Sequence, residues 1–135
     1  GKLNNYQKGV GPSIMLRCRG IRGAITVAEN SREELLPATG ELLGELLRAN
    51  GVQAEDIACI FFTTTPDLTA EFPAAAAREM GLGAVPLLCS HEMNVPDSLP
   101  HCIRILMLVN TEKKAEEMIH LYLREAKNLR WKGER

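Results

Sequence analysis

A carboxylate and a guanidinium stand at two ends of an apolar frame in the middle of this chain. Glu92 follows a short apolar stretch that ends in Cys89, and Arg104 opens a longer apolar stretch that runs to Val109. We interpret the frame as a strand, a loop and a second strand. Glu92 and Arg104 are therefore predicted to face one cleft, where both signs of charge can contact a polar ligand.

Further arginines and one tyrosine could join this pair. Arginine binds a carboxylate through two parallel hydrogen bonds and stays charged, so several arginines suit a ligand that carries more than one carboxylate. A single glutamate among them would accept a hydrogen bond from a ligand hydroxyl. Taken alone, Arg22 and Arg78 also fit ordinary surface charges without a function. The candidate polar set is Arg22, Arg78, Glu92, Arg104, Tyr122 and Arg130.

Motifs for cofactors and for covalent catalysis are missing from the sequence. There is no G-x-G-x-x-G motif, no P-loop and no serine nucleophile elbow. The 4 cysteines and 3 histidines do not have the spacing of a zinc site. Cys89, Ser90 and His91 are neighbours in the sequence, and adjacency along an extended chain is not the geometry of a Cys/His nucleophile pair. We expect no cofactor and no metal, and a reaction that needs only positioning and charge stabilisation.

Length, charge and hydropathy narrow the class of protein. The 135 residues suit one domain. The formal net charge is −1, with 16 basic and 17 acidic residues, and this argues against a general nucleic-acid binder. No apolar run is long enough to predict a transmembrane helix or a signal peptide. Unpaired cysteines without a disulfide pattern are typical of a reducing compartment, so we expect a cytoplasmic protein.

The elements that must position these residues begin with a strand. Alternation from Leu16 to Glu29 predicts a strand with one face against a core. Arg22 shares the other face with two small residues, Ala24 and Thr26, and this pattern predicts room for a ligand beside the guanidinium.

The clearest helix is predicted from Ser31 to Asn50. Ser31 and Glu34 have the spacing of a capping box, and leucines recur at helical spacing along one face. Gly51 has the position of a C-terminal cap. Pro37 removes one hydrogen bond and could kink the first turns. We assign this helix a structural role.

The remaining elements alternate short strands with a second, shorter helix. Phe72 stands immediately before that helix, Pro73 at its first position and Gly81 just past its end. In the last segment Tyr122 is predicted to face away from the leucines on either side of it. The predicted ranges are a strand at 57–65, the short helix at 73–80, strands at 85–89, 103–109 and 118–123, and a short helical tail at 125–130.

This order predicts an α+β fold, with a single mixed sheet and one long helix on a face. The other face also needs burial, which predicts oligomerisation. We expect the folded domain to span residues 15–131. Residues 1–14 are predicted to be a disordered extension, native or added, and residues 132–135 a frayed tail.

Several blocks of this sequence resemble the AroH-class chorismate mutases. They occur in the same order, across residues 16–131, without a large insertion. The blocks are RGIRGAITV (19–27), TPDLTAEFPAAAAREMG (65–81), VPLLCSHEMNV (85–95), LPHCIRILMLVNT (99–111) and HLYLREAKNLR (120–130).

The resemblance implies an enzyme that converts chorismate to prephenate on the route to phenylalanine and tyrosine. It implies a homotrimer with a pseudo-α/β-barrel core and an active site at each subunit interface. No cofactor, metal or covalent intermediate is implied, and we expect neither nucleic acid nor a membrane as a partner.

The resemblance also assigns roles to individual residues. Arg22 matches the arginine that binds a substrate carboxylate, and Arg104 matches the arginine beside the ether oxygen. Glu92 matches the glutamate that accepts from the ring hydroxyl, with Cys89 beside it. Tyr122 matches the tyrosine that contacts the side-chain carboxylate. The residues that match the cleft mouth and the tail that closes it are Phe72, Arg78, Leu129 and Arg130.

Two departures and two alternatives accompany this interpretation. Ala75 stands where some members have a lysine, and Leu88 stands where some have a threonine. The main alternative is a non-catalytic trimer that binds a small carboxylate-bearing metabolite, since a fold alone does not decide function. A pure binder has less use for Glu92 opposite Arg104. A trimeric deaminase fits the blocks poorly.

Overall fold

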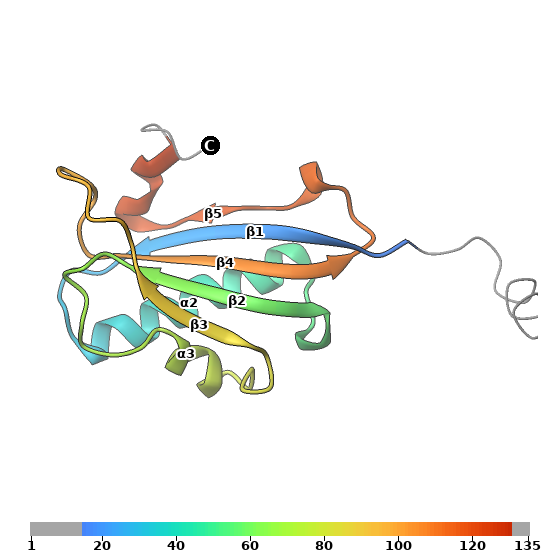
Figure 1. Ribbon diagram of the computed structural model, residues 1–135, viewed down its shortest axis with the longest axis horizontal. Helices are drawn as coiled ribbons and strands as arrows, with labels where there is room; N and C mark the ends of the chain where they lie inside the picture. The colour runs from blue at the N-terminus through green and yellow to red at the C-terminus, as the bar shows by residue number, and fades with distance from the viewer. Residues whose placement is uncertain (1–14, 131–135) are drawn as a thin grey trace, which may run out of the picture.

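The computed structural model of the chain describes residues 15–130. Its centre is a 5-stranded mixed sheet in the order β3-β2-β4-β1-β5 (Figure 1). β4 is antiparallel to both β1 and β2, and β3 and β5 add as parallel edge strands. The predicted α+β class and single mixed sheet are confirmed. The strands are β1 (Arg17–Thr26), β2 (Ile57–Thr64), β3 (Leu87–His91), β4 (Cys102–Thr111) and β5 (Leu121–Tyr122).

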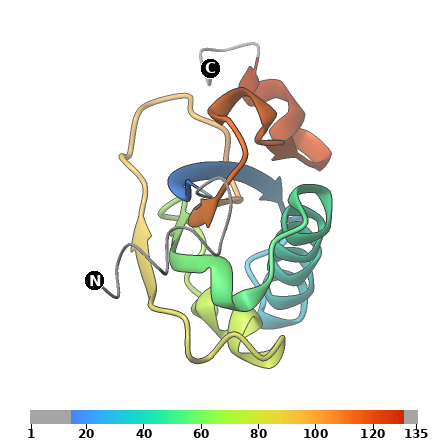
Figure 2. The ribbon, with the colours of Figure 1, turned by 90° about the vertical axis from the view of Figure 1, so that its right-hand side faces the viewer.

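Both α-helices pack on the same face of the sheet. They are α2 (Arg32–Asn50) and α3 (Ala74–Glu79), and the end-on view shows them together on one side (Figure 2). Alternate residues of β1, β2 and β4 project into the core that the helices cover, because successive side chains of a strand point to opposite faces. The largest fully buried side chains there include Ile21, Ile25, Leu42, Leu46, Phe62, Ile105 and Met107.

The ends of α2 follow the predicted capping residues, with one difference. The Ser31 hydroxyl accepts the Glu34 N–H, and Gly51 adopts φ 61° past the last turn. The second half of the predicted capping box is wrong, since Glu34 accepts the N–H of Ala28 at 3.1 Å. Glu34 therefore ties the chain leaving β1 to the helix. The helix also continues through Pro37 to Asn50.

The third strand is shifted relative to the prediction. A strand was expected at 85–89, whereas β3 runs from Leu87 to His91. Parallel pairing with β2 extends the ladder, with Thr63 opposite Ser90 and Thr64 opposite His91. The sequence pattern around Ser90 is polar, so only the neighbouring strand reveals that these residues are extended.

The last segment is also corrected by the structure. A strand was predicted at 118–123, but β5 contains only Leu121 and Tyr122. The predicted tail helix is instead a 3₁₀ segment, η3 (Arg124–Arg130). Leu121 and Leu123 pack against the main core, while Tyr122 joins a smaller buried cluster on the other side. The prediction that Tyr122 faces away from the leucines on either side of it is therefore confirmed. Two shorter 3₁₀ turns are η1 (Ala54–Asp56) and η2 (Ala115–Glu117).

The face of the sheet opposite α2 and α3 remains partly uncovered within the described chain. It carries three large exposed apolar side chains on adjacent strands, and we call it the open face. They are Leu88 (58 % exposed), Phe61 (36 %) and Leu106 (39 %). Pairing places Phe61 directly between Leu88 of β3 and Leu106 of β4. The predicted termini, 1–14 and 132–135, lie outside the described residues, as does residue 131, the predicted last residue of the domain.

Candidate active site

Strand pairing aligns the predicted charged residues on the open face. Arg104 of β4 lies opposite Thr63 of β2 on one side and opposite Ala24 of β1 on the other. Arg22 lies opposite Leu106, one row further along the sheet. Two rows of side chains therefore cross the strands, and each row contributes one guanidinium to the open face.

Glu92 is brought to this face by the strand before it. Its backbone N–H donates to the Thr64 carbonyl at 2.8 Å, which continues the pairing of β3 with β2 by one residue. Its carboxylate oxygen Oε2 accepts the Thr63 hydroxyl at 2.5 Å and lies 3.8 Å from Nε of Arg104. Both side chains of the ion pair are 31 % exposed. The predicted convergence of Glu92 and Arg104 is thus present in the folded chain.

Two cavities meet at Glu92 and Arg104. The smaller, the central cavity, has a volume of about 210 Å³ and is also lined by Arg22, Phe61 and Thr63. The larger, the loop cavity, has about 650 Å³. Its walls are the loop after β3 and part of η3, including Leu129. The pair therefore lies where a ligand can be held between the sheet and the two segments that lie over its end.

Arg22 and Tyr122 flank the pair but differ in exposure. The Arg22 side chain is half-buried, and its backbone N–H donates to Nδ1 of His120 at 3.0 Å. Tyr122 is buried, beside Ala24 and Ala126. The predicted room beside Arg22 is present as the central cavity. It does not extend over Ala24 and Thr26, which are buried beneath η3. Glu125 N–H donates to the Thr26 hydroxyl, which holds η3 in that position.

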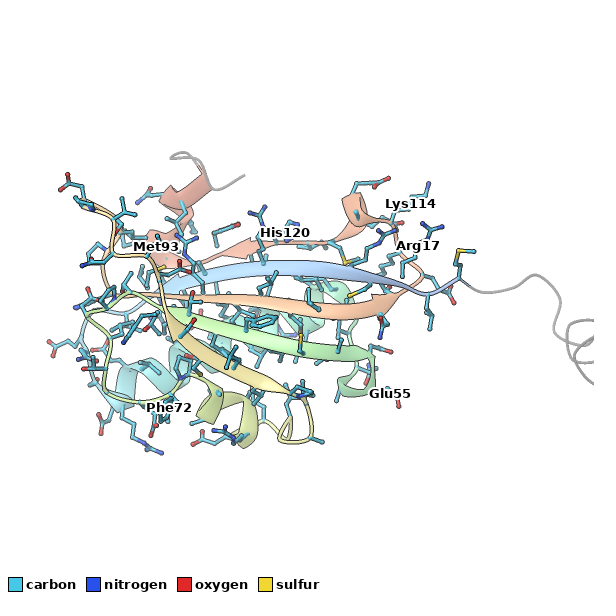
Figure 3. All side chains as sticks on the ribbon, viewed as in Figure 1. Arg17, Glu55, Phe72, Met93, Lys114 and His120 are labelled. Carbon is cyan, nitrogen blue, oxygen red and sulfur yellow. The ribbon has the colours of Figure 1, made fainter. Side chains whose placement is uncertain are left out.

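Cys89 and Phe72 line a different cavity, beside β3 and the start of α3. This edge cavity has a volume of about 380 Å³ and also includes Glu71 and His91 in its wall. Phe72 is 67 % exposed at its rim. Figure 3 shows Phe72 near α3, and Met93 on the loop that follows β3, at the same end of the molecule.

The expectation that Cys89 lies beside Glu92 on one wall is not met within the chain. Cys89 packs against the helix-covered core, whereas Leu88 projects to the open face. Burial raises the pKa of the Cys89 thiol, and a hydrogen bond to the backbone of Ala74 and the charge of Arg78 only partly oppose this. The thiol therefore stays protonated at neutral pH, which disfavours it as a nucleophile.

The residues predicted at the cleft mouth and in the closing tail lie in different parts of the structure. Arg78 is exposed on α3, and its charge acts on both Cys89 and Glu71, which line the edge cavity. Leu129 lines the loop cavity. Arg130 ends η3, and its side chain lies outside the described residues.

Comparisons with known proteins identify the family of this chain. A family model described as chorismate mutase type I matches residues 18–132. The chain belongs to the type I chorismate mutase family.

Two curated relatives carry the name chorismate mutase AroH. The protein from Thermus thermophilus is 53 % identical over 113 residues, which cover 83 % of this chain and 93 % of the relative. The protein from Bacillus subtilis is 42 % identical over 113 residues, covering 83 % and 89 %. The function of this chain is that of a chorismate mutase, an isomerase of aromatic amino acid biosynthesis.

A solved structure supports the same family at the level of the fold. A chorismate mutase from Clostridium thermocellum superimposes with a TM-score of 0.79 and 47 % sequence identity. The match covers 80 % of this chain and 96 % of that chain.

The two departures from the chorismate mutase pattern have different surroundings. Ala75 is half-buried on α3, against the main core. Leu88 is exposed on the open face opposite Phe61. An apolar residue at position 88 extends the apolar part of that face toward its edge.

Sequence reasoning missed two polar residues that contact the predicted set. Thr63 donates to Glu92, and His120 accepts from the backbone of Arg22. Thr63 lies three residues before the turn at Pro66, and the run of threonines around it is typical of ordinary strand sequence. Pairing of Thr63 with Arg104 across β2 and β4 is the only signal that singles it out.

Among the described residues, no group of three or more histidines, cysteines or acidic residues could hold a metal ion. No helix in residues 15–130 has both the length and the apolar character to cross a membrane.

Proposed function

We propose that this chain rearranges chorismate to prephenate at a site shared by two subunits of a homotrimer. The observation that carries the proposal is the division of the expected site residues between two walls of one chain. Arg22, Glu92 and Arg104 line cavities on the open face, whereas Phe72 and Cys89 line the edge cavity. The open-face wall of one subunit and the edge-cavity wall of its neighbour would together form one complete site.

The open-face wall supplies the charges that the rearrangement needs. Chorismate carries two carboxylates, a ring hydroxyl and an enolpyruvyl ether. Arg22 binds a carboxylate, Tyr122 contacts the side-chain carboxylate, and Glu92 accepts a hydrogen bond from the ring hydroxyl. These contacts hold the compact conformer in which the two reacting carbons approach each other, so that positioning lowers the barrier.

Arg104 stabilises the charge that appears during the reaction. As the ether C–O bond lengthens, negative charge gathers on the ether oxygen and a new C–C bond forms in the same step. A fixed guanidinium at that oxygen acts as an oxyanion-hole donor does, without reorganising at the moment of reaction. Glu92 lies beside Arg104 and keeps the guanidinium oriented by their ion contact at 3.8 Å. No group on the protein needs to become covalently attached to the substrate.

The edge-cavity wall closes the site from the neighbouring subunit. Phe72 contributes an exposed aromatic ring, and Cys89 contributes a neutral thiol. Arg78 adds a further positive charge at the mouth of the proposed site. Leu129 and Arg130 belong to the tail segment over the loop cavity. The open face exposes a row of apolar side chains, Leu88, Phe61 and Leu106. Burial of this row against another copy of the chain would be favourable, which supports the proposed homotrimer. A cytoplasmic location is part of this proposal, and the four free cysteines are consistent with it.

The direct test of the reaction is to mix the purified protein with chorismate and follow the decrease in its ultraviolet absorbance. Prephenate should accumulate in equal amount, without added metal or cofactor. Binding of chorismate without turnover would instead support a non-catalytic carboxylate binder.

The shared site is tested by mixing two defective variants. Arg104→Ala removes the charge of the open-face wall, and a Phe72→Ala/Arg78→Ala double variant impairs the edge-cavity wall. Each is assayed alone, then the two are unfolded together and refolded as a mixture. Random mixing should restore about a quarter of the sites to two intact walls, because each site takes its walls from different subunits. Activity no higher than the average of the two variants would refute a shared site.

A further inference from the structure

We infer that Thr63 is a positioning residue for the reaction, and that its hydroxyl orients the Glu92 carboxylate. This inference rests on the proposed role of Glu92 as the acceptor for the ring hydroxyl. Thr63 is half-buried in β2, and its hydroxyl donates to Oε2 of Glu92 at 2.5 Å. Hydrogen bonds from a hydroxyl to a carboxylate are short and stronger than neutral ones.

The contact divides the two oxygens of the carboxylate between two tasks. Oε2 receives the Thr63 hydroxyl and also faces Nε of Arg104. Oε1 accepts no hydrogen bond from the residues that the structure describes. A carboxylate held by one oxygen presents the other in a fixed direction, and Glu92 lines both cavities that meet at Arg104. Oε1 is therefore the acceptor left for the substrate.

Thr63 is suited to this task by its place in the sheet. It pairs with Ser90 of β3 on one side and Arg104 of β4 on the other. Glu92 follows β3 and is bonded through its backbone to Thr64, so its side chain can reach back along β2 to Thr63. A β-branched side chain in a strand has few rotamers, so the hydroxyl is fixed before substrate arrives. Without it, the one side chain between residues 15 and 130 that still contacts the Glu92 carboxylate would be Arg104, at the longer distance of 3.8 Å.

The test is a set of variants at Thr63 assayed with chorismate. Thr63→Val keeps the branched shape and removes the hydroxyl, and kcat/KM should fall about tenfold or more, the usual range for losing a hydrogen bond to a charged group. Thr63→Ser keeps the hydroxyl and should stay within about threefold of the parent. Thr111→Val removes a threonine hydroxyl at the far end of β4, where it bonds only the Lys113 backbone among the described residues, and should leave kcat/KM unchanged.

A double-variant cycle separates positioning from a structural role. In a Glu92→Ala background, Thr63→Val should cost nothing further, because the carboxylate that it orients is gone. A tenfold loss that persists in that background would overturn the inference, as would full activity of Thr63→Val beside an impaired Glu92→Ala. If Thr63→Val does not fold, as judged by its thermal unfolding, Thr63→Ala takes its place in the same cycle.

The cycle also distinguishes this inference from the role assigned to Glu92. Full activity of Glu92→Ala would refute that role, and the inference about Thr63 with it. Loss of activity in Glu92→Ala, with no effect of Thr63→Val, would leave the role of Glu92 intact and refute only the inference.

Discussion

The two faces of the sheet use the same strands in opposite ways. In β2, Phe62 points into the core under α2 and is fully buried, while its neighbour Phe61 remains 36 % exposed on the open face. In β4, Ile105 and Met107 are buried, and Arg104 lies between buried neighbours with its charge on the open face. One face is completed within the chain, whereas the other holds the charges and stays partly exposed among the described residues.

The difference shows that stability and function are carried by alternate residues of the same strands. Removing a side chain from the covered face leaves a cavity that the chain cannot fill. Removing one from the open face leaves the core intact and, under the proposed shared site, takes away a contact to substrate or to a neighbouring subunit. Adjacent positions in the sequence should therefore give opposite kinds of defect.

The largest effect is expected from Phe62→Ala. Truncating a buried phenylalanine should lower the free energy of unfolding by about 3–5 kcal/mol. Phe61→Ala is the matched control, and its main effect should be weaker assembly, seen as a thermal unfolding midpoint that depends more strongly on protein concentration. Equal losses of unfolding free energy at both positions, independent of concentration, would break the contrast between the faces.

A somewhat smaller effect, confined to catalysis, is expected from Arg104→Ala. Loss of an oxyanion-type donor typically costs about 2.7–4 kcal/mol, so kcat should fall at least about a hundredfold. Arg104→Lys should also be poor, since an ammonium group does not reproduce the planar fork of guanidinium. Thermal unfolding and molecular mass should match the parent. A near-normal kcat in Arg104→Ala would remove this residue from the mechanism.

The smallest effect is expected from Asp67, which lies in the turn after β2. Burial raises the pKa of its carboxyl, but hydrogen bonds from the Thr65 hydroxyl and the His101 backbone N–H, with the charge of His101, outweigh burial and lower the pKa. His101 ends the loop that lines the loop cavity, and Cys102 after it also donates to Thr65. Asp67 thus joins that loop to β2.

Because the pKa of Asp67 is lowered in the folded state, the stabilisation that its contacts provide is weaker in acid. The stabilisation is present above the unfolded-state pKa of about 3.9 and is lost as pH falls through the lower folded-state pKa. Asp67→Asn should be less stable than the parent at neutral pH, and the difference in unfolding free energy should shrink below about pH 4. Denaturant unfolding across that range checks the sign. A difference that stays constant with pH would show that the carboxylate charge contributes nothing.

Local patterns were sufficient to predict much of the fold and the central pair of the site. The leucine spacing and the caps at Ser31 and Gly51 located α2, because helix ends are satisfied by nearby residues. Glu92 and Arg104 lie at the two ends of one loop that connects two strands. This arrangement predicted that their side chains would lie close together. Their ion contact needs only that β3 and β4 flank the same strand, β2.

Predictions failed where a residue's environment comes from distant parts of the chain. β3 continues through Ser90 because β2 pairs with it, and no local pattern indicates this. Cys89 was expected beside Glu92, yet in the shifted strand β3 it packs against the core while its neighbour Leu88 is exposed on the open face. Likewise Ala24 and Thr26 look like open space in the sequence, and η3 covers them from about a hundred residues away.

The sequence by itself determined the alternation of each strand, the apolar stripe of α2 and the types of charge available, since these depend on neighbours within a few residues. The tertiary structure alone decided which face of the sheet the helices cover. That choice depends on how the strands pair and where both helices pack. It places Thr63 beside Glu92, and it separates Cys89 and Phe72 from the charges on the open face.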